Sequence, residues 1–280
     1  MPELPEVETI VRGLRNGDHE RKLLVGCTFT DVKLFWERTL ASPVPQEFVE
    51  RIIGQTIVDI CRRGKYIIFH LTEEKLLIHL RMSGDLRVET IFDEHGVVRP
   101  DGRHDRVVFY FEDDLRLVFV DPRKFGRVWL TKMPEKILGK LGPEPLSPGL
   151  TCETFFDLLK TRRRQLKPLL MDQTFLAGLG NIYTDEALHL AKLHPLQKAD
   201  KLTLEDVCRL LNAIRSVLRE GIQKNGASID WVYKGGSYQN TFRVYQRTEE
   251  PCLECGQSIK KIIVGQRGTH FCPGCQPFFS

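Results

Sequence analysis

The residues Met1-Pro2-Glu3-Leu4-Pro5-Glu6 hold the groups of this chain most able to do covalent chemistry. A small second residue permits removal of Met1, which would leave Pro2 with a free secondary amine. An α-amino group titrates near pH ~8, so a useful fraction is neutral and nucleophilic at neutral pH. Such an amine can attack the anomeric carbon of a sugar and form a Schiff base, with Glu3 and Glu6 transferring protons. The same residues also suit an ordinary helix start, because proline and acidic side chains favour the first turn.

Four cysteines near the C-terminus form the strongest local motif, as the pairs Cys252-x2-Cys255 and Cys272-x2-Cys275. Each pair points two thiolates at one centre, which predicts a tetrahedral four-thiolate zinc site. Four protein ligands leave no open position, so the zinc is expected to be structural. Two disulfides and an iron–sulfur cluster are the alternatives. Disulfides are less expected in a cytoplasmic chain. An iron–sulfur cluster is less expected because the usual cysteine spacings of such clusters differ.

The segment Gly178-Leu179-Gly180-Asn181 precedes a predicted helix. The glycines free the backbone and Asn181 can cap the helix, whose first amides would then be able to bind phosphate. A plain Asn-capped turn between two core helices explains the same residues without a ligand.

The elements that position these groups fall into two regions. Apolar runs at 66–71, 76–80, 107–111 and 115–120 predict strands joined by hairpins, and this spacing favours an antiparallel sandwich. Prolines and glycines in 142–149 indicate a linker. Beyond it, helices are predicted over 151–159 and 207–222, the second after the capping box Thr203-x-x-Asp206. Two strands, 259–264 and 268–271, are predicted between the cysteine pairs.

The charge of +4 is unevenly distributed along the 280 residues. Residues 1–150 carry a net −1 and residues 151–280 a net +5, and a basic half suggests a polyanionic partner. Basic residues cluster locally in Arg162-Arg163-Arg164 with Lys167, and in Lys260-Lys261 with Arg267. The sequence has neither an 18-residue apolar run nor a signal-peptide pattern, so a cytoplasmic protein is expected.

Taken together and in order, short segments of the whole chain resemble formamidopyrimidine-DNA glycosylases, the bacterial repair enzymes for oxidised purines. The matching segments are Pro2–Thr9, Arg63–Tyr66, His79–Gly84, Asp121–Gly126, Leu141–Leu146, Gly178–Tyr183 and the cysteine-rich tail.

The resemblance implies an α+β fold with three parts. These are an N-terminal antiparallel β-sandwich with flanking helices over residues 1–141, a helix-two-turn-helix domain over 150–243 after the linker 142–149, and a β-hairpin zinc finger over 244–280. Residues 226–242 correspond to the loop that closes over the flipped base, and they match the family least well.

The resemblance also implies a role for each candidate residue. Pro2 would be the nucleophile, Glu3 its acid/base partner, and Glu6, Lys65 and Arg267 further members of the catalytic group. The implied DNA contacts are Met82, His104, Arg123, Phe125, Asn181, Tyr245 and Arg267, of which Met82, Arg123 and Phe125 fill the gap left by the extruded base. One structural zinc ion on the four cysteines is the only cofactor implied.

The implied activity is excision of oxidised purines from double-stranded DNA, followed by strand cleavage at the abasic site, by a monomer that does not bind membranes. Endonuclease VIII, a sister glycosylase for oxidised pyrimidines, shares Pro2, Glu3 and the zinc finger. It typically starts Pro-Glu-Gly-Pro, whereas Leu4 stands before Pro5 here. A non-catalytic DNA-binding protein is the second alternative, and the intact Pro2-Glu3 pair argues against it.

Overall fold

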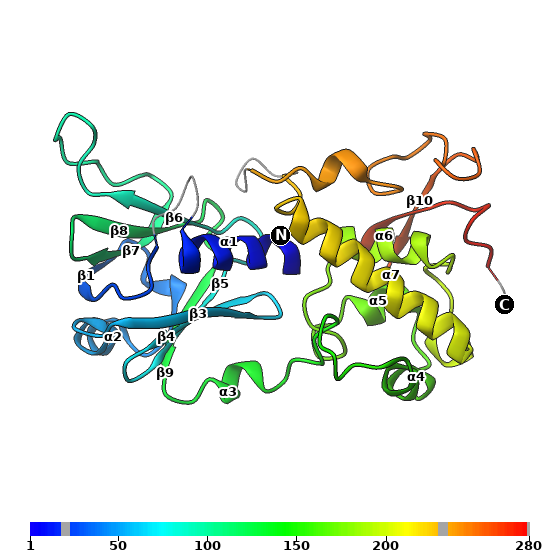
Figure 1. Ribbon diagram of the computed structural model, residues 1–280, viewed down its shortest axis with the longest axis horizontal. Helices are drawn as coiled ribbons and strands as arrows, with labels where there is room; N and C mark the ends of the chain where they lie inside the picture. The colour runs from blue at the N-terminus through cyan, green and yellow to red at the C-terminus, as the bar shows by residue number, and fades with distance from the viewer. Residues whose placement is uncertain (18–22, 229–234, 279–280) are drawn as a thin grey trace. The chain divides into compact units, whose positions relative to one another are not determined.

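The computed structural model describes residues 1–17, 23–228 and 235–278 (Figure 1). The chain forms two compact units, each with its own buried apolar residues. The first contains Met1–Pro2, Glu6–Gly139 and Ser228, and the second contains Glu3–Pro5, Lys140–Ala227 and the segment from Gly235 onward. The short N-terminal segment therefore contributes to both units.

Two β-sheets make up most of the first unit. One has the strand order β1-β7-β8-β6 and the other β2-β9-β5-β4-β3. The strands are β1 (Phe29–Leu34), β2 (Leu40–Ser42), β3 (Ile57–Arg63), β4 (Tyr66–Leu71), β5 (Lys75–His79), β6 (Asp85–Thr90), β7 (Asp105–Phe111), β8 (Leu115–Val120) and β9 (Arg127–Thr131). Buried residues of both sheets, such as Phe109 and Phe69, belong to one hydrophobic cluster. This confirms the predicted sandwich.

Helices flank these sheets. The first, α1 (Leu4–Asn16), buries Val7, Ile10 and Leu14 in the same cluster, at the spacing that brings side chains to one helix face. The others in this unit are α2 (Pro45–Ile52), α3 (Glu135–Leu138) and the short 3-10 turn Glu37–Thr39.

Both predicted hairpins are present. Phe69 pairs with Leu76 across β4 and β5, and β5 begins one residue earlier than predicted. Asp113 and Asp114 connect β7 to β8 with φ of 59° and 55°, the left-handed values that a tight type I′ turn requires. One pairing departs from the antiparallel prediction: the short strand β2 pairs with β9 in parallel.

The second unit is mainly helical. It contains α4 (Cys152–Lys160), α5 (Leu166–Leu170), α6 (Asn181–Leu190), α7 (Leu204–Gln223), the 3-10 turns Ala199–Lys201 and Tyr238–Thr241, and the hairpin strands β10 (Lys260–Val264) and β11 (Arg267–Phe271). Thr203 and Asp206 form the predicted capping box, and Thr151 caps α4 in the same way. The predicted helices and the predicted C-terminal hairpin are thus confirmed.

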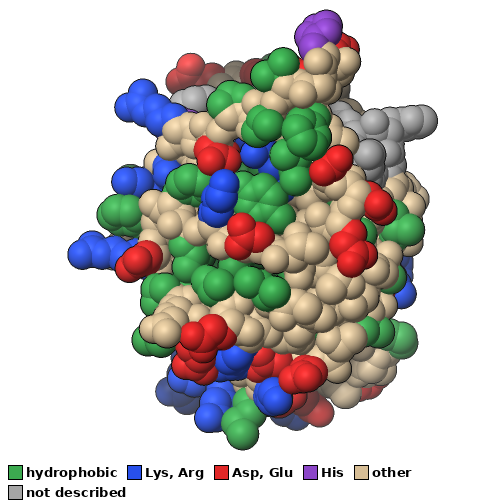
Figure 2. Space-filling model, turned by 90° about the vertical axis from the view of Figure 1, so that its left-hand side faces the viewer, with side chains coloured by type: hydrophobic (Ala, Val, Ile, Leu, Met, Phe, Trp, Pro, Cys, Tyr) green, Lys and Arg blue, Asp and Glu red, His purple; other side chains and the backbone are tan. Residues whose placement is uncertain are grey.

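Figure 2 shows the face of the first unit that is on the left in Figure 1. Hydrophobic side chains lie near the centre of this face, with acidic and basic side chains interspersed around them. A surface of mixed charge does not provide the continuous positive potential that contact with a phosphate backbone needs. Among the described residues, no helix has the length and apolar character needed to span a membrane.

Candidate functional site

The side chain of Glu3 is held at the start of helix α6, within the second unit. It is 3% exposed, and its two carboxylate oxygens accept hydrogen bonds from the backbone amides of Gly180 at 2.7 Å and Ile182 at 2.9 Å. The amide of Tyr183 lies 3.4 Å away. The unpaired amides of a helix start favour an anion. Here that anion is Glu3, where the sequence had suggested a phosphate.

The glycines before α6 are required by the close approach of the N-terminal segment. A Cβ atom on Gly180 would lie 2.4 Å from Glu3 Cδ, and one on Gly178 would lie 2.6 Å from Leu4 Cδ1. Gly178 has φ of +103° and its carbonyl accepts a hydrogen bond from the Leu4 amide at 3.0 Å. The Gly-x-Gly spacing therefore forms a cradle for Glu3 and Leu4.

Pro2, Glu6 and Lys65 belong to the first unit. Pro2 is half-buried and directly precedes Glu3, while Glu6 and Lys65 are each 3% exposed. Lys65 follows Gly64, whose φ of 57° makes the turn between β3 and β4. Burial on this scale restricts the Lys65 side chain to few directions.

The turn carrying Lys65 is tied to helix α1. The Arg62 guanidinium donates to Glu8 of α1 at 3.0 Å and to the Gly64 carbonyl at 3.0 Å. Burial raises the pKa of Glu8, but hydrogen bonds from Arg12 and Arg62 outweigh it and lower that pKa overall. Glu8 therefore remains a carboxylate that fixes this turn against α1.

His79 at the end of β5 is an ionisable group that the sequence did not single out. Burial, followed by the charges of Arg81 and Lys65, lowers the pKa of His79 to about 3. Its Nδ1 accepts a hydrogen bond from the Arg81 amide at 3.0 Å, so the ring is neutral and supports the turn that follows. That turn carries Met82.

One carboxylate, Asp121, organises the turns that present Met82, Arg123 and Phe125. Asp121 has no exposed surface and accepts hydrogen bonds from the Ser83 hydroxyl at 2.5 Å, the Arg123 amide at 3.2 Å and the Gly126 amide at 2.7 Å. The Asp121 amide also donates to the His104 carbonyl at 2.9 Å. The four DNA-contact candidates of the first unit are therefore grouped by a residue that carried no predicted role.

The side chains that Asp121 presents point to solvent. Met82 is 38% exposed and Phe125 is 48% exposed, so both side chains are accessible to a partner. The Arg123 guanidinium lies 5.2 Å from the centre of the Phe125 ring, within the range of a cation–π contact. Exposed apolar side chains can replace a base in a stack, and a forked cation can bind the acceptor atoms of an unpaired base.

The remaining DNA-contact candidates, Asn181, Tyr245 and Arg267, lie in the second unit. Asn181 is the first residue of α6 and Gly180 occupies the cap position, so the expected Asn181 cap is wrong. Its amide nitrogen instead donates to the Gly268 carbonyl at 3.2 Å, next to the exposed Arg267 at the start of β11. This bond ties Asn181 to the strand that carries Arg267.

Lys167 does not belong to a basic surface, although its sequence neighbours suggested one. It is fully buried, and its ammonium donates to Asp185 at 2.5 Å and to the Gly268 carbonyl at 3.1 Å. Asp185 also accepts the His270 amide at 2.9 Å. The buried pair therefore fixes β11 against α5 and α6.

Tyr245 is held in a comparable way. Glu186, also fully buried, accepts hydrogen bonds from the amides of Arg243, Val244 and Tyr245 at 2.8–2.9 Å. The Tyr245 ring packs against His270 with centres 5.1 Å apart. The strand with Arg267 and the segment with Tyr245 are thus fixed by neighbouring acidic residues of α6.

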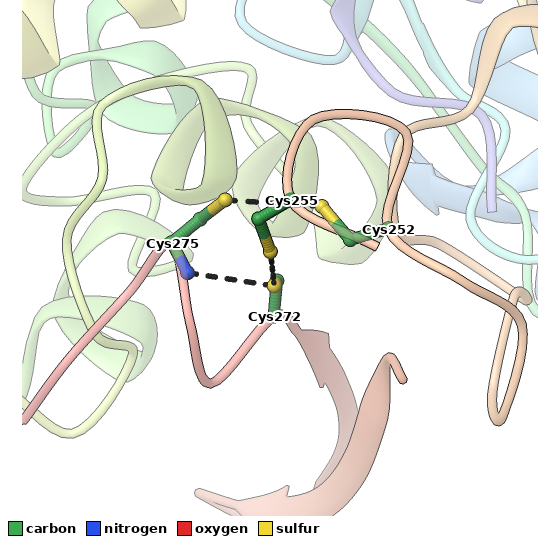
Figure 3. A group of neighbouring side chains, drawn as sticks. All are labelled: Cys252, Cys255, Cys272 and Cys275. Atoms are coloured by element: carbon green, nitrogen blue, oxygen red, sulfur yellow. Dashed lines mark hydrogen bonds between the residues drawn. The ribbon is translucent and has the colours of Figure 1, made fainter. Parts of the chain in front are cut away.

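The four C-terminal cysteines converge as predicted (Figure 3). Their sulfur atoms all lie within 4.8 Å of one another, with 3.8 Å between Cys252 and Cys275 and 3.3 Å between Cys255 and Cys272. A tetrahedral zinc ion with Zn–S bonds of about 2.3 Å needs sulfur atoms about 3.8 Å apart, so this set fits one zinc ion. All eight cysteines are free, and the disulfide alternative is therefore wrong.

The residues that the sequence did not single out for a function share one feature: each is a polar side chain, buried or mostly buried, that positions another residue. They are Arg62, His79, Ser83, Asp121, Asp185, Glu186 and His189. His79, Ser83 and Asp121 lie in segments that carried the family resemblance, which was the available signal for them.

Three family models match successive parts of the chain. The model for the N-terminal domain of formamidopyrimidine-DNA glycosylase matches residues 1–128, and that for its H2TH domain matches residues 141–232. The model for the zinc finger found in FPG and IleRS matches residues 249–277, which include all four cysteines. This match supports zinc over an iron–sulfur cluster.

Relatives match over the whole length. The formamidopyrimidine-DNA glycosylase of Protochlamydia amoebophila is 43% identical over 99% of both chains, and that of Enterococcus faecalis is 41% identical over 99% of this chain and 97% of its own. The Lactococcus lactis enzyme, solved in complex with DNA containing an abasic site, is 36% identical with a TM-score of 0.88, and covers 99% of this chain and 100% of that one. By these matches, the chain belongs to the formamidopyrimidine-DNA glycosylase family.

Proposed function

We propose that this protein excises oxidised purines from duplex DNA by nucleophilic attack of Pro2 and then cleaves the strand. The family consists of DNA glycosylases with lyase activity at abasic sites. Solved relatives are complexes with DNA containing an abasic site, a Fapy-dG lesion or carbocyclic 8-oxo-G. Those ligands indicate the substrate class, formamidopyrimidines and 8-oxoguanine.

The observation that carries the proposal is the position of Glu3. A buried carboxylate fixed by backbone amides directly follows the residue whose nitrogen would attack. A proton-transfer group must lie within hydrogen-bond reach of the reacting atoms, and adjacency in the chain keeps Glu3 near the Pro2 nitrogen. A carboxyl group with free rotation would not offer such a fixed geometry.

The reaction then follows from the chemistry of a secondary amine. The Pro2 nitrogen bonds to C1′, the bond from C1′ to the base breaks, and the base leaves with its bonding electron pair and takes up a proton. Glu3 takes up the proton of the Pro2 nitrogen and passes it to O4′ as the C1′–O4′ bond opens, which gives an iminium ion. The positive nitrogen acidifies the C2′ protons, so the 3′ phosphate leaves by β-elimination and the 5′ phosphate by δ-elimination.

Access to C1′ requires that the damaged nucleotide leave the helix, which costs a few kcal/mol of stacking and pairing. We assign Met82 and Phe125 to filling the gap and Arg123 to the orphaned cytosine, because all three are presented by the turns that Asp121 joins. We assign Lys65, Asn181, Tyr245 and Arg267 to phosphates. We assign His104 to a further DNA contact and Glu6 to the catalytic group. Residues 229–234 of the predicted lesion-capping loop lie outside the described residues.

Borohydride trapping tests the proposal directly. Reduction of the iminium ion links enzyme and DNA covalently, so the parent protein should give an adduct with an abasic duplex and Pro2→Gly should give little. Protein that retains Met1 should give none, because its proline nitrogen is then an amide. Equal adduct yield from Pro2→Gly and parent would exclude Pro2 as the nucleophile, and no adduct from the parent would favour a non-catalytic binder.

The endonuclease VIII-type alternative needs a separate measurement. Single-turnover excision from matched duplexes should be faster for 8-oxoguanine opposite cytosine than for an oxidised pyrimidine at the same position. The reverse order would assign the protein to oxidised pyrimidines.

A further inference from the structure

Helix α6 contacts the cysteine-rich tail through side chains one turn apart. Asn181 donates to Gly268 and Asp185 accepts from His270, both on β11. The next residue in this series is His189, four residues after Asp185. Its Nε2 lies 3.5 Å from the Sγ atom of Cys252, one of the four zinc-binding cysteines.

The contact with Cys252 is the single hydrogen bond of the His189 ring among the described residues. The ring is fully buried, and its Nδ1 has no hydrogen-bond partner there. The nearest acidic oxygen to Nδ1 is Glu254 Oε1, at 3.9 Å, and Glu254 is already paired with Lys192. A proton on Nε2 therefore gives the ring one hydrogen bond, to sulfur.

Four thiolates and one Zn²⁺ ion together carry a charge of −2, so N–H groups directed at sulfur stabilise the site. Within the cysteine-rich turns a backbone amide serves this purpose: that of Cys275 donates to Cys272 Sγ at 3.4 Å. His189 differs because it reaches the site from a helix more than sixty residues earlier in the chain. It can therefore anchor the metal site to α6 as well as stabilise the thiolate by a hydrogen bond.

We propose that the Nε2–H of His189 donates a hydrogen bond to the Cys252 thiolate and thereby slows loss of the zinc ion. Side chains that hydrogen-bond to metal ligands affect metal affinity typically by ~10–100-fold. The proposal is independent of the chemistry assigned to Pro2. Its alternative is that the ring only fills space beside Cys252.

Substitutions at His189 separate these two roles. His189→Phe keeps an aromatic ring of similar size and removes the donor, and His189→Met removes it with a flexible side chain. His189→Gln places an amide N–H near the position of Nε2. His194→Phe is the matched control: this second largely buried histidine of the same unit packs on Phe271 and Phe278 rather than on a cysteine sulfur.

The measurement is the rate at which zinc-loaded full-length protein releases zinc to excess 4-(2-pyridylazo)resorcinol. We expect zinc loss about 10–100-fold faster in His189→Phe and His189→Met, and within a few-fold of the parent in His189→Gln and His194→Phe. Cobalt(II)-substituted protein gives a second readout. Removal of an N–H donor raises the energy of the sulfur lone pair, so the thiolate-to-cobalt charge-transfer band should shift to longer wavelength in the Phe and Met variants only.

Two results would overturn the proposal. If His189→Phe and His189→Met release zinc at the parental rate with an unshifted cobalt band, the ring does not support the thiolate. If His189→Gln releases zinc as fast as His189→Phe, the shape of the ring rather than its hydrogen bond slows zinc release in the parent. Should one variant fail to fold, the other two at this position still distinguish these outcomes.

Discussion

The cradle around Glu3 predicts that a single methyl group at Gly180 should disable catalysis and leave the fold largely intact. In Gly180→Ala the added Cβ would lie 2.4 Å from Glu3 Cδ and 2.5 Å from Glu3 Oε1. Gly180 lacks a positive φ, so alanine can adopt its backbone conformation without strain. The side chain of Glu3 is the group that must give way.

The size of the effect follows from these distances. Ordinary contact begins near 3.4 Å, so the carboxylate must retreat by about 1 Å. Its hydrogen bond from the Gly180 amide, now 2.7 Å, would then exceed hydrogen-bonding range. Misplacement of a catalytic group by about 1 Å can cost ~100-fold in rate, which equals about 2.7 kcal/mol of activation free energy. Loss of glycine at a helix cap adds about 1 kcal/mol of destabilisation at most.

Single-turnover trapping by borohydride on an abasic duplex measures this effect, with DNA affinity and thermal unfolding recorded alongside. Gly180→Ala should trap ~100-fold more slowly, with a Kd within a few-fold of the parent and a Tm lower by a few degrees. Gly149→Ala is the matched control, because its Cβ would meet only the Ser147 hydroxyl at 3.7 Å. Parental trapping by Gly180→Ala would show that the position of Glu3 is not what the reaction depends on.

Three further predictions concern other parts of the site. Cys272→Ser, or removal of zinc by a chelator, should weaken DNA binding while the first unit stays folded; undiminished affinity in metal-free protein would contradict a positioning role for the finger. Arg123→Ala should reduce discrimination between bases opposite the lesion by about 1–3 kcal/mol, whereas Lys65→Ala should weaken binding to damaged and undamaged duplexes alike and reduce the salt slope by about one unit; the opposite pattern would reverse these assignments. Burial lowers the pKa of His79 from 6.5 to about 3. Between pH 6.5 and about pH 3 the unfolded protein therefore binds a proton at His79 that the folded protein does not. The free energy of unfolding should fall as pH drops through this range, by up to roughly 1.4 kcal/mol per pH unit. Urea unfolding at a series of pH values should show that the free energy of unfolding falls less steeply with decreasing pH in His79→Phe than in the parent. An unchanged pH dependence would exclude His79 as the cause.

Much of the fold was accessible from the sequence because local patterns and tertiary structure agree. Apolar runs at 66–71 and 115–120 became strands β4 and β8, and the Thr203 capping box starts α7. The short strand β2 was missed because three residues carry no period and its parallel pairing with β9 is a purely tertiary event.

The sequence predicted which residues form the candidate site, but not how most of their side chains are arranged in space. Cys-x2-Cys pairs determine their own geometry, so the convergence of the four sulfur atoms followed from spacing. Glu3 and Gly180 are 177 residues apart in the chain, and nothing local indicates that the carboxylate would occupy the helix start. The expected role of Asn181 as a cap failed for the same reason, since Glu3 already meets the amides that a cap would serve.

Helix α6 shows why buried polar residues escape pattern analysis. Helices are recognised by an apolar face opposite a polar one, yet Asp185, Glu186 and His189 are all fully buried. An apolar side chain of similar volume is often as stabilising as a buried charge, so stability alone does not explain them. Each of these side chains forms a hydrogen bond with a specific atom of the segment from Arg243 to Cys272. Apolar contacts alone would not fix the position of that segment along α6. Their hydrogen bonds fix the register between α6 and the tail. The phosphate contacts that we propose for Arg267 and Tyr245 would depend on that register.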